Sequence, residues 1–85
     1  MRQIKIVSLV AGQFFISEIE EVGADIGQPD CKLIKPYIIN GSLELHKYMV
    51  ELTDEEVFMI SSDKILTLAD PNQNFLKQYL VNQYF

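Results

Sequence analysis

The stretch that most constrains this sequence is residues 57–68, where two short apolar segments flank a polar turn. Val57–Ile60 and residues 65–68 are too short for helices and rich in the large apolar side chains typical of strands. Residues 61–64 supply the turn, and Asp70-Pro71 then marks a helix start. A chain built this way combines short strands, tight turns and a terminal helix.

Strand-like alternation also precedes this stretch, at residues 4–10, 13–22 and 31–39. Ala11-Gly12 predicts a compact turn between the first two segments. Residues 23–30 contain two glycines and a proline, which predicts a loop before the third segment. The sequence before residue 57 therefore indicates strands and connections, with no helical periodicity.

Three features refine the middle of the chain. Pro36 cannot donate a ladder hydrogen bond, so it belongs at a sheet edge or a bulge. Asn40-Gly41 predicts a two-residue type I′ hairpin turn, because both residues tolerate positive φ. Residues 42–52 alternate weakly, and they either begin a fourth strand or elaborate a loop.

The chain ends in a predicted helix over about residues 71–83. Asp70 is the expected N-cap, Pro71 the first helical residue, and Gln73 the second member of a capping box. A helix of this length is marginal in water, so it must pack on the sheet or on another subunit. With the strands at about residues 3–69, this predicts one mainly β domain over residues 1–85: a small, strongly bent antiparallel barrel with a C-terminal α-helix.

The composition favours self-association. A chain of 85 residues buries only roughly 60–65% of its unfolded surface, so its core is thin. Yet 48% of the residues are hydrophobic, and five Phe and four Tyr are present. This surplus predicts an apolar surface that another copy covers.

The charge narrows the possible partners and compartments. Twelve acidic residues outnumber seven scattered basic ones, and tight phosphate binding usually needs a concentrated positive patch. One Cys and one His exclude an intrachain disulfide and a zinc cluster, and a catalytic group would have to use His46, which no nucleophile motif surrounds. With neither a signal peptide nor an apolar span, we expect a soluble cytoplasmic protein with no membrane partner.

Residues 60–68, Ile-Ser-Ser-Asp-Lys-Ile-Leu-Thr-Leu, resemble the second motif of the Sm and Sm-like proteins, which reads roughly Ile-Arg-Gly-x-x-Ile-x-x-Ile. Leu9-Val10-Ala11-Gly12 is similar to the Leu-x-x-Gly that opens their first motif. The order of elements looks especially like the small Sm-like proteins of tailed phages, including cyanophages. The resemblance covers most of the chain and implies a bent five-stranded barrel whose exposed strands pair across subunits into a closed ring.

The resemblance also implies which residues join the copies. In a ring of about five to seven copies, one strand of each subunit would pair with another strand of the next. The interface residues would be Val57, Phe58, Met59 and Ile60 of one copy and Ile65, Leu66, Thr67 and Leu68 of its neighbour.

The same resemblance places the turn Ser61, Ser62, Asp63 and Lys64 at the central hole of the ring. RNA-binding relatives carry Arg-Gly where this sequence has Ser61 and Ser62. Lys64 could still meet a phosphate, and Tyr37 and Tyr48 could stack bases. The turn residues and Tyr37 are the candidate RNA site. The simpler interpretation is an ordinary polar turn and two packed tyrosines.

Two functions follow as hypotheses. The first is a non-catalytic Sm-like ring that binds single-stranded RNA or serves RNA-linked regulation, in the host cytoplasm if a phage encodes it. The second is an acidic ring-shaped adaptor or structural protein that binds other proteins and no RNA. Neither hypothesis assigns a catalytic residue, a metal or a cofactor.

Overall fold

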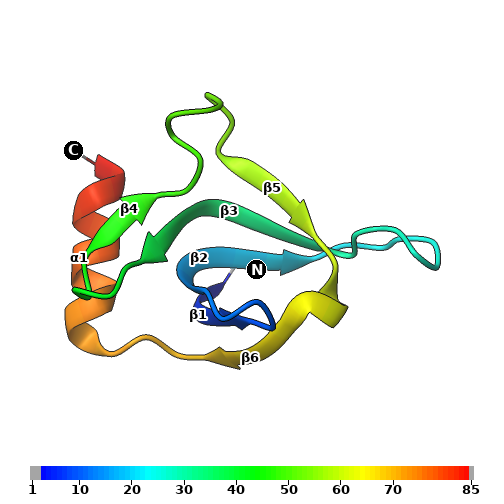
Figure 1. Ribbon diagram of the computed structural model, residues 1–85, viewed down its shortest axis with the longest axis horizontal. Helices are drawn as coiled ribbons and strands as arrows, with labels where there is room; N and C mark the ends of the chain where they lie inside the picture. Colours follow the sequence, from blue (N-terminus) through cyan, green and yellow to red (C-terminus); the bar gives the residue numbers. More distant parts are fainter. Residues whose placement is uncertain (1–2, 85) are drawn as a thin grey trace.

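The computed structural model describes residues 3–84 and shows an antiparallel sheet of six strands followed by one helix (Figure 1). The mainly β class and the C-terminal helix predicted from the sequence are confirmed. The strands are β1 (Gln3–Leu9), β2 (Phe14–Glu21), β3 (Cys31–Ile39), β4 (Leu45–Lys47), β5 (Val57–Ile60) and β6 (Ile65–Ala69), and the helix α1 spans Gln73–Tyr84.

The strand order is β4-β3-β2-β1-β6, and β5 pairs with β3 beside β4. β4 and β5 therefore share one edge of β3. Residues 37–39 of β3 pair with β4, and residues 31–34 of β3 pair with β5. Within residues 3–84, β5 and β6 do not pair with each other, so the sheet is not closed into a barrel. The two strands that flank the turn of residues 61–64 lie at opposite ends of the sheet (Figure 1).

The concave side of the sheet holds the main core. Val7, Phe15 and Leu33, from three adjacent strands, are almost completely buried. Tyr48 packs edge-on against Phe15, with the ring centroids 4.9 Å apart. Partly buried residues surround this centre: Leu9, Ile19, Ile38, Ile60 and Ile65. The alternation read in the sequence thus places Val7, Phe15 and Leu33 on one face of β1, β2 and β3.

A bulge interrupts the β2–β3 ladder between Ile16 and Glu18. Opposite it, Lys35 takes a positive φ of 53°, and the buried Pro36 follows. Pro36 therefore lies at a bulge, one of the two placements that the sequence allowed. A bulge bends the strand and leaves ladder groups unpaired, and these groups need other partners.

Tyr79 of α1 supplies those partners. Its side chain is fully buried, and its hydroxyl accepts a hydrogen bond from the Glu18 N–H at 3.2 Å. The same hydroxyl donates toward the Lys35 carbonyl at 2.9 Å and lies 3.2 Å from the Ile34 carbonyl. The helix is thus fastened to the sheet at the point where the ladder is broken.

The connection after β3 differs from the predicted type I′ turn. Residues 40–44 form a longer loop, in which the Asn40 N–H donates to the Glu44 carbonyl at 3.0 Å. The Asn40 side-chain oxygen accepts from the N–H groups of Ser42 and Glu44, each at 2.9 Å. The positive φ falls on Leu43, at 62°, and not on Gly41. The two-residue turn was therefore wrong, because the Asn40 side chain organises a wider loop.

Residues 42–52 divide between the two predicted alternatives. Only Leu45–Lys47 pairs as a strand, and tight turns follow it. Met49 has a φ of 57°, and its carbonyl accepts from the N–H groups of Leu52 and Thr53. The short strand β4 thus ends in a projecting loop that leads to β5.

The start of α1 lies two residues later than predicted, at Gln73. The cap is Asn72, whose side-chain oxygen accepts from the Phe75 N–H at 2.9 Å. Asp70 instead receives a hydrogen bond from Lys5 Nζ at 2.6 Å. The Asp70 cap was wrong, because a residue distant in sequence engages that carboxylate.

Candidate functional site

The two end strands of the sheet carry the most distinctive exposed surface. Exposure is 45% for Val57 and 50% for Met59 in β5, and 67% for Leu66 and 47% for Leu68 in β6. Neither strand contains a charged residue or a proline, the residues with which proteins usually block a free edge. We refer to β5 and β6 together as the edge strands.

The turn between the edge strands is a single turn of 3₁₀ helix, Ser62–Lys64. Ser61 precedes it with an extended backbone, and its carbonyl accepts from the Lys64 N–H at 3.0 Å. The Lys64 carbonyl in turn accepts from the Val10 N–H at 2.9 Å. The turn is thus tied to the β1–β2 connection, while the side chains of Ser62, Asp63 and Lys64 remain exposed.

Asp30 occupies the hydrogen-bond donors of Ser62. One carboxylate oxygen accepts from the Ser62 N–H and the other from the Ser62 hydroxyl, both at 2.7 Å. The hydroxyl first, and then the N–H, lower the pKa of Asp30 below its ordinary value. An anion at this turn would therefore have to displace a charged carboxylate from Ser62.

No local sequence pattern indicates this contact. Asp30 lies 32 residues before Ser62. The two meet because Cys31 at the start of β3 lies opposite Ile60 at the end of β5. The contact follows from the pairing of β3 with β5, and the local sequence pattern does not encode that pairing.

The structure does not bring Tyr37 to the turn. Tyr37 lies six residues along β3 from Cys31, or about 20 Å at roughly 3.3 Å per residue. Its ring packs edge-on against Tyr79, with centroids 5.7 Å apart, and its hydroxyl donates to the Asn82 carbonyl at 3.2 Å. Tyr37 thus belongs to the contact between helix and sheet, and within one subunit it lies apart from the turn.

Tyr48, the other tyrosine considered for stacking, lies against the core. Its ring contacts Phe15 and also Phe58, the latter at a centroid distance of 5.2 Å. The packing interpretation of Tyr48 is confirmed.

Carboxylates surround the start of β3. Burial raises the pKa of the Cys31 thiol, and the charges of Asp30 and Glu21 raise it further. Cys31 is therefore a buried, protonated thiol. The nearby 3₁₀ turn contributes one more carboxylate, that of Asp63, and one basic residue, Lys64.

Other groups with chemical potential are dispersed. His46 Nε2 lies 2.9 Å from Glu51 Oε2, and both side chains are more than half exposed. In the described part of the chain, no three His, Cys, Asp or Glu side chains group as metal ligands would. Within the same residues, no helix is long and apolar enough to cross a membrane.

A profile for a family of unknown function, DUF6561, matches residues 2–83. The chain belongs to the DUF6561 family. The match runs from the first strand to near the end of α1, so it covers the edge strands, the turn and the Tyr79 contact. A search of curated proteins finds no match. Membership of DUF6561 assigns no activity to the chain.

Proposed function

We propose that this DUF6561 protein is a non-catalytic Sm-like module whose copies join through the edge strands into a closed ring. The ring serves as an acidic scaffold for other proteins. One observation carries the proposal: the strands at the two ends of the sheet are short, free of charge and half exposed on apolar side chains.

An unpaired apolar edge is a hazard for a soluble protein, because any other strand can add to it. Two such edges on one subunit allow open-ended growth unless the rotation between copies closes a ring. Pairing β5 of one copy with β6 of the next covers both edges at once. This arrangement supports an Sm-like barrel that is completed by neighbours rather than within one chain.

The sequence resemblance supports the same arrangement. The residues similar to the second Sm motif, 60–68, run from the last residue of β5 through the 3₁₀ turn and into β6. In one subunit these two strands belong to opposite ends of the sheet and leave their outer edges free within residues 3–84. That disposition is what pairing between copies requires.

The charge favours protein partners over nucleic acid. Each copy has a net charge of −5, and a ring multiplies it. Asp30 holds both donors of Ser62, and Asp63 stands beside them. These carboxylates repel phosphate and attract basic protein segments.

RNA binding is the second candidate, and the exposure of Lys64 favours it. Lys64 ends the turn between the edge strands, so a ring would bring together one Lys64 from every copy. Such a cluster would neutralise part of the carboxylate charge near it.

Fluorescent oligo-U and oligo-A, titrated with the full-length protein at low and moderate salt, separate the two candidates. We expect no change in anisotropy at either salt, for the wild type or for Lys64→Gln. Binding at low salt that Lys64→Gln removes, and that Lys77→Gln on α1 does not, would replace the scaffold with the RNA function. Light scattering on the same samples tests the ring independently of any ligand.

A further inference from the structure

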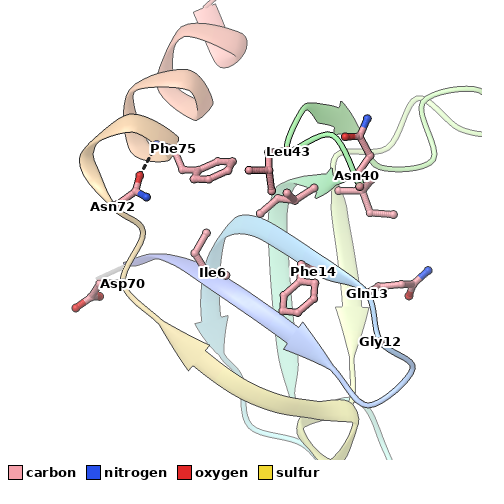
Figure 2. A pocket seen from close by; sticks show the side chains of 12 residues that line it. Ile6, Gly12, Gln13, Phe14, Asn40, Leu43, Asp70, Asn72 and Phe75 are labelled. Carbon is pink, nitrogen blue, oxygen red and sulfur yellow. Dashed lines mark hydrogen bonds between the residues drawn. The ribbon is translucent and has the colours of Figure 1, made fainter.

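An apolar groove lies between α1 and the outer face of the sheet, beside the loop of residues 40–44 (Figure 2). Its volume is about 840 Å³. Figure 2 shows Phe75 of α1 pointing toward Leu43 of the loop, above Ile6 and Phe14 of the sheet. Ile38 and Ile39 complete the apolar lining. The size lies within the range of known ligand sites.

Two residues of the groove are in unfavourable states that the fold of the subunit does not explain. Leu43 adopts a left-handed backbone, which strains a non-glycine residue, yet its side chain is 63% exposed. Phe14 is 51% exposed although it lies in a strand. A strained, exposed Leu and an exposed Phe on facing walls indicate side chains retained to contact another molecule.

The form of the groove indicates what that molecule is. Because the side chains of Leu43 and Phe14 in its walls are more than half exposed, a small molecule would remain partly solvated in it. Ile6 lies in a strand paired on both sides, and so does Ile38. An added strand would find no free backbone groups at these positions, so binding must rely on side chains. A helix that inserts its apolar face meets that requirement.

The charge around the groove indicates the flanks of such a helix. None of the lining residues is basic, and Asp70 is acidic. Lys5, which is not a lining residue, contacts the Asp70 carboxylate through its Nζ at 2.6 Å. With a net charge of −5 on the chain, the surroundings favour a cationic segment.

We propose that this groove binds a basic amphipathic helix of another protein, with apolar side chains against Phe14, Leu43 and Phe75. The inference goes beyond the assembly of the edge strands, because the groove is complete within one subunit. It rests on the proposed scaffold only in that a ring would present one groove per copy.

The test uses a fluorescent peptide of about 16 residues, long enough for a helix to form on binding, with Leu at helical spacing and Lys elsewhere. Matched peptides replace Lys with Glu or scramble the Leu positions. We expect the Lys peptide to bind the full-length protein with micromolar affinity, and the other two to bind at least about tenfold more weakly. No binding of the Lys peptide, or equal binding of the Glu peptide, would overturn the proposal.

Variants locate the binding site. Leu43→Gly and Phe14→Ser should each lower the affinity for the Lys peptide by about fivefold or more, because each removes a side chain that anchors the peptide. Ile26→Ser, which removes a fully exposed apolar side chain outside the groove, should have no effect. Equal binding by all three variants would place the peptide elsewhere and contradict the proposal.

Light scattering of the same variants separates this inference from the ring. We expect Leu43→Gly and Phe14→Ser to keep the mass of the wild type. If either variant lowers the mass, a second copy covers the groove, and the proposed peptide partner is wrong. If the wild type is monomeric yet binds the peptide at the groove, the groove proposal stands and the ring fails.

Discussion

The outer face of the sheet and its two ends treat apolar surface in opposite ways. On the outer face, Ile16 and Tyr79 are completely buried, and the Tyr79 hydroxyl satisfies the backbone groups that the bulge leaves free. At the ends, Met59 and Leu66 are at least half exposed, and the outer edges of β5 and β6 are unpaired within residues 3–84. The part of the outer face that Tyr79 covers is completed by the chain itself. The two ends are left for another molecule.

The difference separates what stabilises a subunit from what joins subunits. Burial by α1 contributes to folding at any protein concentration, whereas coverage of the edge strands depends on the concentration of copies. Changes under the helix should therefore lower stability without a specific effect on mass. Changes at the edges should lower the mass without unfolding the subunit.

The largest effect is expected at Tyr79. Tyr79→Ala should destabilise the protein by about 3–5 kcal/mol, because it leaves a cavity and unpaired backbone groups. Tyr79→Phe, which keeps the ring, should cost about 1–3 kcal/mol through the lost hydroxyl alone. Urea unfolding at a fixed protein concentration measures both. A Tyr79→Phe variant as stable as the wild type would contradict the role given to the hydroxyl.

The next effect is expected at the edge strands. Met59→Lys and Leu66→Lys place a charge on an exposed apolar site, so each should dissociate the assembly while changing subunit stability by only about 0.5 kcal/mol. Light scattering gives the mass, and circular dichroism checks the fold. Ile26→Lys, on the exposed loop before β3, is the matched control and should keep the native mass. Unchanged mass in both edge variants would remove β5 and β6 from the interface.

A smaller effect is expected from the Asp30–Ser62 contact. The pKa of Asp30 is lowered in the folded state, so its contribution to stability is present above the unfolded pKa, about 3.9, and is lost as pH falls through the folded pKa. Asp30→Asn should therefore flatten the loss of stability below about pH 4. Urea midpoints measured from neutral to acid pH test this. The hydrogen bond from Lys47 also lowers the pKa of Glu56, and Asp30→Asn leaves this carboxylate in place. The variant should therefore still lose some stability as the pH falls. Identical profiles for the variant and the wild type would show that the contact contributes nothing in solution.

The smallest effect is expected at Leu43, where a substitution should increase the stability of the subunit. Leu43→Gly should stabilise the subunit by roughly 0.5–1 kcal/mol, because glycine adopts the left-handed backbone without strain. Leu52→Gly is the control, since Leu52 is also exposed but is not among the residues with positive φ. Urea unfolding should show a small loss for this control. A loss of stability in Leu43→Gly would mean that the Leu43 side chain supports the loop itself.

Local sequence signals predicted the elements but not how they meet. Alternation and the apolar runs located the strands and the helix to within a few residues, because these patterns reflect burial within one element. The contact of Tyr79 with Glu18 spans 61 residues, and that of Asp30 with Ser62 spans 32. Such contacts depend on strand pairing, so no local pattern indicated them.

The candidate site shows the same limit. The apolar edge strands were predicted as an interface, and the structure leaves them exposed. Tyr37 was grouped with the turn because both suit RNA, but the register of β3 separates them. Positive φ at Lys35, Leu43 and Met49 could not be predicted either, since none of these positions is a glycine.

Hydrogen exchange of the backbone amides tests the central claim most directly. In the native protein at micromolar concentration, we predict that the amides of β5 and β6 are protected to the level of β2, because neighbouring copies bond to them. In Met59→Lys, the outward amides of both strands should lose protection together while β2 keeps it. Rapid exchange of the outward β5 and β6 amides in the wild type, with β2 protected, would show that the edges are free and would contradict the ring.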